Sequence, residues 1–501
     1  MSENVEANPR RWTALIFISL AQLMVVLDAT VVNIALPAAQ HDLGISDGNR
    51  QWVITAYTLA FGGLLLFGGR LADIAGRKRI FIIGLLGFAA ASAIGGIAAN
   101  TGMLLGARAA QGVFGAMLAP AALSLLAVTF TEAKERAKAF GVFGAIAGGG
   151  GAIGLILGGV LTEYLNWRWA LFVNIPIALI ATAGAYLVIH DVPGARNRNR
   201  LDIPGVLLST AGLVALVYGF TRAESDGWTA AWTVGSFVAA AVLLVAFVLV
   251  ESMVAHPLLP LRVLTERNRA GVYLALGIAV IGMFGLFLFL TYYLQVVKGW
   301  SPVVTGLAFL PMIVGMITGS TQIGARLMNR VAPRLLMGPG FLVAGLGLLI
   351  LTQMKVDSSY VGLILPGLVL LGLGMGTAFM PAMSLATYGV EPRDAGVASA
   401  MINTSQQVGG SIGTALLNTV AASATTAWFV ERGGNPALIN EAAVHGYATA
   451  IWWAVGVMAL AALIAFTFVN TGRQDGGAAV SGSSSTDDED AGAIPVPVFA
   501  H

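Results

Sequence analysis

Asp28 is a carboxylate that the sequence places deep inside an apolar segment, some sixteen residues after that segment begins near Trp12. A charge held at the centre of a bilayer costs at least roughly 2.5–3.5 kcal/mol. An acid kept at that cost usually carries a proton or meets a cation. We therefore take Asp28 as the first candidate for chemistry, with proton binding and release as its expected role.

Arg108 is the matching base, predicted inside the fourth apolar segment. A guanidinium keeps its proton in proteins and therefore needs an acceptor. Asp28 is the obvious membrane-embedded acceptor, although glutamine, asparagine or backbone carbonyl groups could also serve. The pair could be a structural tie between two helices. It could instead take part in proton transfer, with Asp28 alternating between a protonated form and a carboxylate while a proton and a cationic solute compete for it.

Membrane helices are the elements expected to position these two residues. The chain of 501 residues is 57% hydrophobic and only 10% charged, whereas soluble domains carry about 25% charged residues. Runs of about 18–25 apolar residues are long enough to cross a bilayer as helices. We expect fourteen of them, at residues 12–37, 50–69, 80–99, 102–128, 138–162, 168–189, 203–221, 230–250, 270–295, 303–325, 335–353, 360–384, 395–421 and 449–470.

The basic residues of the loops predict the orientation, because cytoplasmic loops carry an excess of Lys and Arg. With both termini cytoplasmic, 20 of the 27 Lys and Arg residues fall on the inner side and 6 on the outer side, with Arg108 as the remaining one. No small-residue cleavage site follows the first apolar run, so we expect that helix to be retained and not removed as a signal peptide. The segment 422–448 is then a long outer connection.

Residues 69–79 (Gly-Arg-Leu-Ala-Asp-Ile-Ala-Gly-Arg-Lys-Arg) are predicted to fill the inner loop between the second and third helices. Glycine permits a tight reversal, and an aspartate can meet a helix N-terminus or an arginine in one conformation only. The run could be an ordinary basic stop-transfer loop, or a conformational latch formed by Gly69, Asp73, Gly76, Arg77 and Lys78. It resembles the loop motif of the major facilitator superfamily, Gly-x-Leu-Ala-Asp-Arg-x-Gly-Arg-Arg/Lys, with Ile74 where a basic residue is usual.

The fifth predicted helix carries Gly150, Gly154, Gly158 and Gly159. Glycines four residues apart make one smooth helix face, along which another backbone can approach closely. Generic helix packing would explain this spacing. The spacing is also similar to the motif Gly-x8-Gly-x3-Gly-Pro-x2-Gly-Gly of drug antiporters, with Leu155 in the place of the proline.

Two further runs carry a closer resemblance. Residues 27–37 match every fixed position of Leu-Asp-x-Thr-Val-Val-Asn-x-Ala-Leu-Pro, the first-helix motif of the fourteen-helix drug:proton antiporters. Residues 167–176 resemble that family's connection between the fifth and sixth helices. Arg108, Gln111 and Gly112 match the superfamily's fourth-helix motif Arg-x-x-Gln-Gly, which is associated with proton transfer. On these motifs the chain is identified as a member of that antiporter family.

The resemblance implies an all-α integral membrane protein with the major facilitator fold, fourteen transmembrane helices in a 6+2+6 arrangement and both termini cytoplasmic. The expected parts are a cytoplasmic N-terminus (1–11), a six-helix bundle (12–190), two additional helices with flanking cytoplasmic loops (191–269), a second six-helix bundle (270–470) and a disordered cytoplasmic tail (471–501). In this superfamily the two bundles rock around a central site and open it to each side in turn.

Polar residues inside the predicted helices are candidates for lining a substrate cavity. Asn403, Gln406 and Gln407 stand at i, i+3 and i+4 and therefore share one helix face. Such a face of amides could line a cavity or tie helices together, and the sequence leaves both possibilities open. The full candidate set is Asn33, Tyr57, Gln111, Tyr292, Gln295, Asn403, Gln406 and Gln407.

Several function classes are disfavoured by what the sequence lacks. It has no Gly-Lys-Ser/Thr phosphate loop, no nucleotide-binding domain and no metal-ligand cluster, so we expect no ATP-driven pump, no cofactor, no metal and no enzyme. The absence of cysteine excludes disulfide and thiolate sites. A net charge of +2 is too small to suggest a nucleic-acid partner.

The expected function is proton-coupled export of lipophilic, neutral or cationic drugs or natural products by alternating access. Its expected partners are the small-molecule substrate, protons and the lipid bilayer, with no nucleotide and no obligate protein partner. We expect it in the cell membrane, as in the inner membrane of a bacterium. The alternatives are a proton-coupled uptake symporter of a small solute and a non-transporting membrane receptor or scaffold.

Overall fold

The computed structural model describes residues 10–130, 132–189, 202–254, 257–328, 330–387, 390 and 395–470, and every regular element in this part of the chain is a helix. The predicted N-terminal segment 1–11 therefore lies outside the described residues except for its end, and the predicted tail 471–501 lies outside them entirely. The apolar composition explains the all-helical structure, because a helix satisfies its own backbone hydrogen bonds in lipid.

The helices follow the predicted order. The first half of the chain forms α1 (Arg11–Leu43), α2 (Trp52–Ala75), α3 (Arg77–Gly96), α4 (Thr101–Thr129), α5 (Ala133–Tyr164), the short α6 (Trp169–Phe172) and α7 (Asn174–Val188). Two helices follow, α8 (Ile203–Asp226) and α9 (Ala231–Met253), and then the short α10 (Leu261–Thr265). The second half forms α11 (Arg267–Tyr292), α12 (Pro302–Ala308), α13 (Leu310–Thr318), α14 (Ala325–Leu327), α15 (Arg334–Leu351), α16 (Leu365–Thr387), α17 (Ala395–Glu431) and α18 (Ile439–Phe468). π-helical turns at Tyr293–Val297, Gly319–Gly324 and Tyr360–Ile364 extend or join these helices, and a 3-10 turn at Pro436–Leu438 precedes α18.

Twelve helical segments in the described part of the chain are long and apolar enough to cross a membrane. The two remaining predicted ranges fall within α5 and α17, which have 32 and 37 residues. Each predicted range therefore coincides with a helical segment. The number of helices that cross the bilayer and the side on which the termini lie stay predictions.

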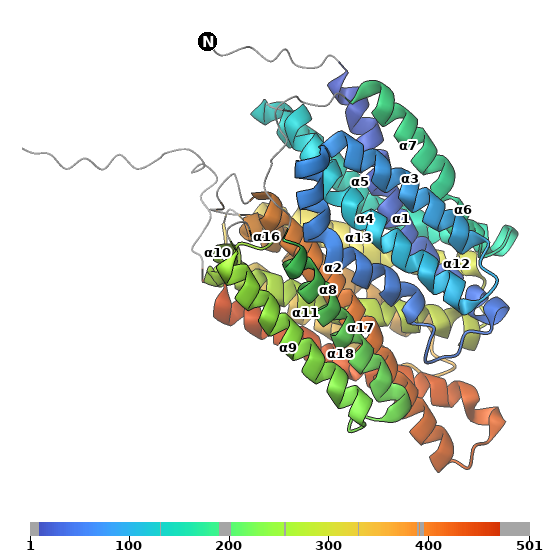
Figure 1. Ribbon diagram of the computed structural model, residues 1–501. Coiled ribbons are helices and arrows are strands. Elements are labelled where there is room, and N and C mark those ends of the chain that lie inside the picture. The colour runs from blue at the N-terminus through green and yellow to red at the C-terminus, as the bar shows by residue number, and fades with distance from the viewer. Residues whose placement is uncertain are drawn as a thin grey trace, which may run out of the picture.

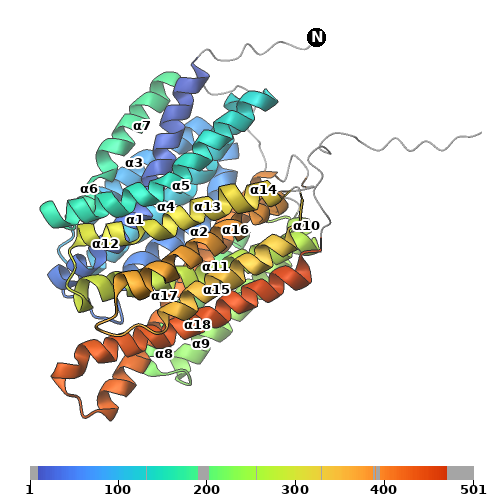
Figure 2. The ribbon, with the colours of Figure 1, turned by 180° about the vertical axis from the view of Figure 1, so that it is seen from behind.

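The helices gather into two halves (Figures 1 and 2). In one half α4 packs against α2 and α3, while α1 packs against α5 and α7. In the other half α11 packs against α17 and α18, and α16 packs against α13 and α15. One buried apolar cluster lies within the first half, mainly on α1–α4 and α7. A larger cluster covers α11–α18 and continues into α1, α2 and α4, so apolar contacts also join the two halves.

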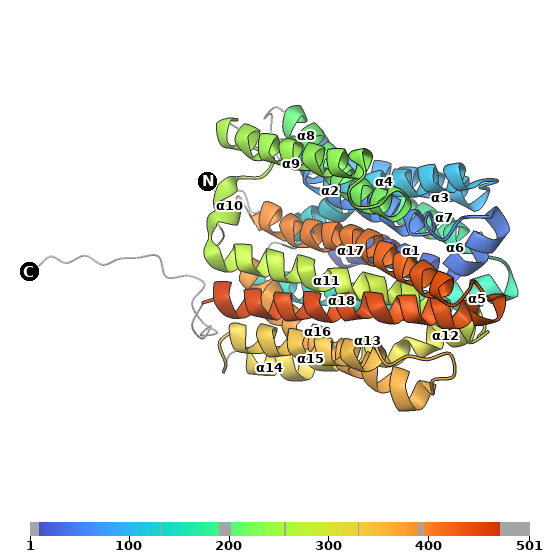
Figure 3. The same cartoon turned by 90° about the horizontal axis from the view of Figure 1, so that it is seen from below.

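The additional pair α8–α9 lies on one side of the molecule, as Figure 3 shows from below. The two helices pack on each other, and α8 also contacts α2 of the first half and α17 of the second. The Thr419 hydroxyl donates to the Phe220 carbonyl at 3.0 Å, and Leu59, Val217 and Ala415 form a small apolar cluster. α9 is mostly exposed, with 17% of its most apolar stretch buried. The pair therefore spans the junction of the halves and presents α9 to lipid.

The two halves are joined at the end that holds the α1–α2 connection, which we call the outer end after the predicted orientation. There Gln295 of the second half donates to the Ile34 carbonyl at 2.9 Å, and Tyr292 donates to Gln40. The hydroxyls of Thr58 and Ser411 lie 2.7 Å apart. These contacts hold α1 and α2 against α11 and α17, so the halves are closed against each other at the outer end.

Three local features of the structure go beyond what the sequence predicted. The predicted inner loop is largely helical, because α2 continues to Ala75 and only Gly76, with φ of 102°, breaks the chain direction. The predicted outer connection 422–448 is also mostly helix, because α17 continues to Glu431 and α18 begins at Ile439. Arg50, in the connection between α1 and α2, is only 7% exposed, and its guanidinium lies 4.1 Å from the Tyr292 ring centre.

Candidate functional site

Asp28 lies at the centre of a buried polar cluster inside the first half. Its Oδ2 accepts a hydrogen bond from Arg108 Nη1 at 2.6 Å. Its Oδ1 accepts from Gln111 Nε2 at 2.9 Å and from Asn174 Nδ2 at 2.8 Å. All four residues are at most 1% exposed. The three donors come from α4 and α7, and together they satisfy Asp28 as an ionised carboxylate.

Arg108 is held as firmly as its partner. Its Nε donates to the Val53 carbonyl at 2.9 Å, and its Nη1 also donates to Gln111 Oε1 at 2.8 Å. The guanidinium carbon lies 4.4 Å from the centre of the Tyr57 ring, a distance typical of a cation–π contact. The arginine thus connects α4 to α2 as well as to α1.

Ser92 of α3 completes the cluster. Its hydroxyl accepts from Gln111 Nε2 at 2.7 Å and from Asn174 Nδ2 at 3.3 Å. The sequence did not point to Ser92, because a serine in an alanine- and glycine-rich helix is common. Asn174 was present in the recognised run 167–176 but received no role. Its amide gains importance only through the fold, which brings α7 beside α1 and α3.

The chemistry of the cluster follows from its charges. A buried ion pair is tolerated because each charge has its partner, and removal of one partner costs about 3–5 kcal/mol. A proton added to Asp28 would have the same electrostatic effect as that removal, since it leaves the guanidinium of Arg108 without a counter-charge. The cluster can therefore convert one proton into a large change in local free energy.

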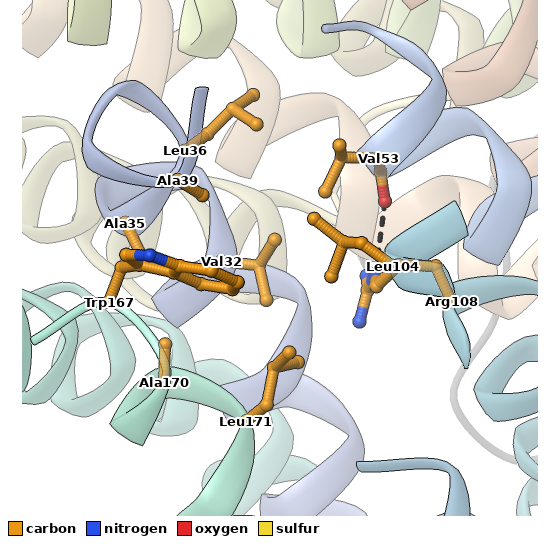
Figure 4. A pocket seen from close by; sticks show the side chains of 10 residues that line it. All are labelled: Val32, Ala35, Leu36, Ala39, Val53, Leu104, Arg108, Trp167, Ala170 and Leu171. Atoms are coloured by element: carbon orange, nitrogen blue, oxygen red, sulfur yellow. Dashed lines mark hydrogen bonds between the residues drawn. The ribbon is translucent and has the colours of Figure 1, made fainter. Parts of the chain in front are cut away.

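A narrow pocket reaches Arg108 from the outer end (Figure 4). Its walls are Val32, Ala35, Leu36, Ala39, Val53, Leu104, Arg108, Trp167, Ala170 and Leu171, so Arg108 is the single charged residue of the lining. The free volume is about 10 Å³, which is room for about one water molecule. Trp167 Nε1 donates to Asp42 Oδ2 at 2.9 Å, which places an acid next to this wall.

The eight predicted cavity residues divide into separate groups. Tyr57 and Gln111 are fully buried members of the Asp28 cluster. Asn33 donates to the Ala29 carbonyl at 2.9 Å within its own helix. Tyr292 and Gln295 make the outer contacts between the halves described above. The other three predicted residues, Asn403, Gln406 and Gln407, are partly exposed on α17.

The glycines of α5 make the close approach that their spacing predicts. A Cβ on Gly158 would lie 2.9 Å from the Val31 Cα, and a Cβ on Gly154 would collide with the Thr30 hydroxyl. On the other side of α5 a Cβ on Gly159 would lie 2.7 Å from the Pro302 carbonyl oxygen. α5 therefore packs backbone to backbone on α1, which carries Asp28, and on α12 of the second half.

The predicted latch residues lie at the junction of α2 and α3. Gly69 packs on Pro120 of α4, and Gly76 adopts the positive φ that favours glycine. Lys78 donates to the Tyr186 carbonyl at 3.0 Å and lies 5.4 Å from the Tyr186 ring centre. The side chain of Asp73 falls outside the described side chains, so its predicted latch contact stays a prediction, as does the role of Arg77.

A model of the Major Facilitator Superfamily matches residues 18–414 of the chain. The chain belongs to this superfamily. It is 54% identical over 466 residues, 93% of this chain and 92% of the relative, to the puromycin resistance protein pur8 of Streptomyces alboniger. It is 39% identical over 456 residues, 90% and 91% of the two chains, to the cephamycin export protein CmcT of Amycolatopsis lactamdurans.

Solved structures agree on the fold. The POT family transporter PepTSo matches with a TM-score of 0.66 at 16% identity, over 90% of this chain and 96% of that one. An inward-facing bacterial homologue of the human lysosomal transporter Spinster matches with a TM-score of 0.65 at 17% identity, over 91% and 96% of the two chains. The family predicted from the sequence is confirmed, and the protein is a multi-pass membrane transporter for small molecules and not an enzyme.

Proposed function

We propose that this transporter exports lipophilic, neutral or cationic drugs or natural products in exchange for protons. Two of its relatives are named for puromycin resistance and cephamycin export. Those names favour outward drug transport over a nutrient symporter, and membership of a transporter superfamily disfavours a receptor or scaffold. The observation that supports the coupling mechanism is the sealed pair of Asp28 and Arg108, with its 2.6 Å hydrogen bond.

Proton coupling acts through the ion pair in this proposal. In the conformation described here the halves are closed at the outer end, and Asp28 is an ionised, fully paired carboxylate. When a proton reaches Asp28, the carboxyl group becomes neutral and the buried guanidinium of Arg108 loses its counter-charge. The guanidinium then favours a conformation that offers it other acceptors or water. Loss of the proton restores the ion pair and returns the transporter to the conformation that is closed at the outer end.

The drug contacts other residues in this mechanism. The sequence suggested that drug and proton compete directly for the Asp28 carboxylate. Because Asp28 is 0% exposed and lies inside the first half, we propose instead that the drug and the proton each favour a different conformation. We place the drug against α17, where Asn403, Gln406 and Gln407 are partly exposed. Amides on an otherwise apolar wall suit lipophilic molecules with few polar groups.

The narrow pocket next to Arg108 supplies the entry path for the proton. It lies between the outer end and the ion pair, it has room for about one water molecule, and Asp42 adjoins its wall. Because the lining exposes only apolar atoms, water enters this pocket only when the halves move, and it then links the outer solvent to the cluster. This route matches protons that enter from outside while the drug leaves.

We also propose the domain division, the latch and the cellular location of the protein. The chain is divided into two six-helix bundles (12–190 and 270–470) with the additional pair between them (191–269), and both termini face the cytoplasm. Gly69, Asp73, Gly76, Arg77 and Lys78 act as the conformational latch. The protein resides in the cytoplasmic membrane of a bacterium, which agrees with the bacterial sources of its relatives.

The proposal is tested with purified protein in proteoliposomes that carry a pH gradient. A panel of lipophilic drugs and dyes, puromycin among them, is offered to the wild type, to Asp28→Asn and to the matched control Asp226→Asn, whose carboxylate pairs with Arg222 at the end of α8. We expect gradient-driven drug movement in the wild type and the control, and its loss in Asp28→Asn. Equal drug movement in all three proteins would reject Asp28 as the coupling group.

A further inference from the structure

A pair of buried acids lies outside the coupling cluster. Asp202 stands immediately before α8, Glu251 stands near the end of α9, and they are 6% and 3% exposed. Neither residue has a part in the mechanism proposed above. Acidic side chains are almost never fully buried unless they are paired, so this pair needs a physical explanation.

Each acid uses one carboxyl oxygen to hold backbone. Asp202 Oδ1 accepts from the Gly205 amide at 2.9 Å and so caps the N-terminus of α8. Glu251 Oε2 accepts from the Leu259 amide at 3.0 Å and so fixes the segment that follows α9. These bonds leave Asp202 Oδ2 and Glu251 Oε1, which are both buried and have no donor among the described residues.

The two free oxygens point to the same place. Both border the position that a Cβ would take on Gly205, with Glu251 Oε1 2.8 Å from it and Asp202 Oδ2 nearer still. The two carboxyl groups are therefore close neighbours, and a hydrogen bond between them would satisfy both free oxygens. The absence of a side chain at Gly205 is therefore what leaves room for the two acids to meet.

A hydrogen bond between two carboxyl groups requires a proton, because two carboxylates offer acceptors only. Two adjacent buried carboxylates also repel each other, which favours a proton held between them. Arg70 of α2 is the cation whose field reaches Glu251. Its guanidinium is bonded to the Pro257 carbonyl at 2.7 Å. Between Glu251 and Arg262 of α10 the sequence holds one titratable side chain, His256, which lies outside the described residues.

The location of the pair allows it to affect several helices at the inner end. It lies where the start of α8 meets the end of α9. Through residues 257–259 and Arg70 it connects these two helix ends to the last turns of α2. Those turns carry the predicted latch. α8 itself contacts α2 of one half and α17 of the other. A change at the pair is therefore transmitted to the junction that must rearrange when the halves rock.

We propose that Asp202 and Glu251 form a second proton-binding site, which shares one proton and holds the α8–α9 pair against the inner end of α2. Loss of the shared proton sets two carboxylates against each other and loosens this attachment. The cytoplasmic pH would then act on transport separately from the coupling proton on Asp28. The existence of the site is independent of the proposed drug export, and only its effect on transport depends on it.

The test is infrared spectroscopy of the full-length protein in lipid nanodiscs, titrated from about pH 5 to about pH 9. The carbonyl band of a protonated carboxyl group is followed in the wild type, Asp202→Asn, Glu251→Gln and Asp28→Asn, with Glu441→Gln of the exposed start of α18 as the control. We expect a band in the wild type that disappears as the pH rises. Asp202→Asn and Glu251→Gln should each lose it, whereas the other two variants should keep it.

A thermal-unfolding series keeps the proposal testable if one variant folds poorly. The wild type should lose several degrees of melting temperature as the pH rises through release of the shared proton, and Glu441→Gln should follow it. Glu251→Gln should lose little, since its amide donates to Asp202 without a titrating proton. A pH-dependent carboxyl band that survives in both pair variants, or equal pH dependence of unfolding in Glu251→Gln and the wild type, would overturn the proposal.

Discussion

Two buried acidic sites in one molecule are stabilised in opposite ways. Asp28 lies in the first half with three donors, one of them the guanidinium of Arg108. Asp202 and Glu251 lie at the edge of the additional helix pair, where their free oxygens both border Gly205. In this proposal the first site holds a carboxylate because Arg108 is in contact with it. The second holds a proton because no described cation bonds to its free oxygens. Neighbouring donors, more than depth, decide whether a buried acid is charged.

Removal of Arg108 is the most severe way to test this contrast. Arg108→Leu leaves a buried carboxylate without its cation, and we expect a loss of about 3–5 kcal/mol of stability. The second substitution Asp28→Asn in the same chain should recover much of that loss, since no unpaired charge remains. Thermal unfolding of the two single variants and the double variant measures the coupling. Additive losses would mean that the two residues do not act as a pair.

Disruption of the close packing of α5 on α1 should cause the next largest loss of stability. Gly158→Ala places a Cβ 2.9 Å from the Val31 Cα, and overpacking of this kind costs about 1–3 kcal/mol. Gly106→Ala is the matched control, because a Cβ there meets nothing within 4 Å. Alanine in place of a mid-helix glycine gains about 0.5–1 kcal/mol, so the control should unfold at an equal or higher temperature. Similar stability of the two variants would argue against the backbone contact.

Disturbance of the acid pair should have a smaller effect that sharpens the comparison. Gly205→Ala inserts a methyl group between Asp202 and Glu251, and it should weaken their hydrogen bond by about 0.5–1.5 kcal/mol. The wild type's dependence of unfolding on pH should shrink accordingly, while drug-driven proton movement through Asp28 continues. If Gly205→Ala abolished that movement, the two acidic sites would not be separate.

The smallest effect is expected from a change in the contacts that close the two halves at the outer end. Tyr292→Phe removes the hydrogen bond to Gln40, worth about 0.5–1.5 kcal/mol, and so favours separation of the halves there by about twofold to tenfold. The chain contains no cysteine, so Ser411→Cys beside Thr58 gives a single site for thiol labelling. Its labelling rate from the outer side should rise in Tyr292→Phe. An unchanged rate would show that this bond does not hold the closure.

The sequence predicted the fold and the central pair for clear physical reasons. Membrane helices are long and apolar, and a charge inside one is costly enough to be noticed, which singled out Asp28 and Arg108. Amides and hydroxyls carry no such cost. Asn174 and Ser92 therefore escaped notice, and Gln111 was assigned to the substrate cavity although it lies in the cluster.

The second acidic site could not be predicted because its burial depends on packing. Glu251 stands one residue beyond the predicted range 230–250, and Asp202 precedes the range 203–221, so both looked like residues at the membrane surface. Only the packing of α8 on α9, with Gly205 between the acids, buries them. The burial of Arg50 escaped prediction for the same reason, because contacts from the other half cover it.

The central claim is that Asp28 carries the coupling proton, and proton release on drug binding tests it most directly. Purified wild type, Asp28→Asn and Glu251→Gln are mixed with a transported drug in weakly buffered solution that contains a pH-indicator dye. The account predicts proton release from the wild type and from Glu251→Gln, and none from Asp28→Asn although it still binds drug. Proton release from Asp28→Asn equal to that of the wild type would contradict the account.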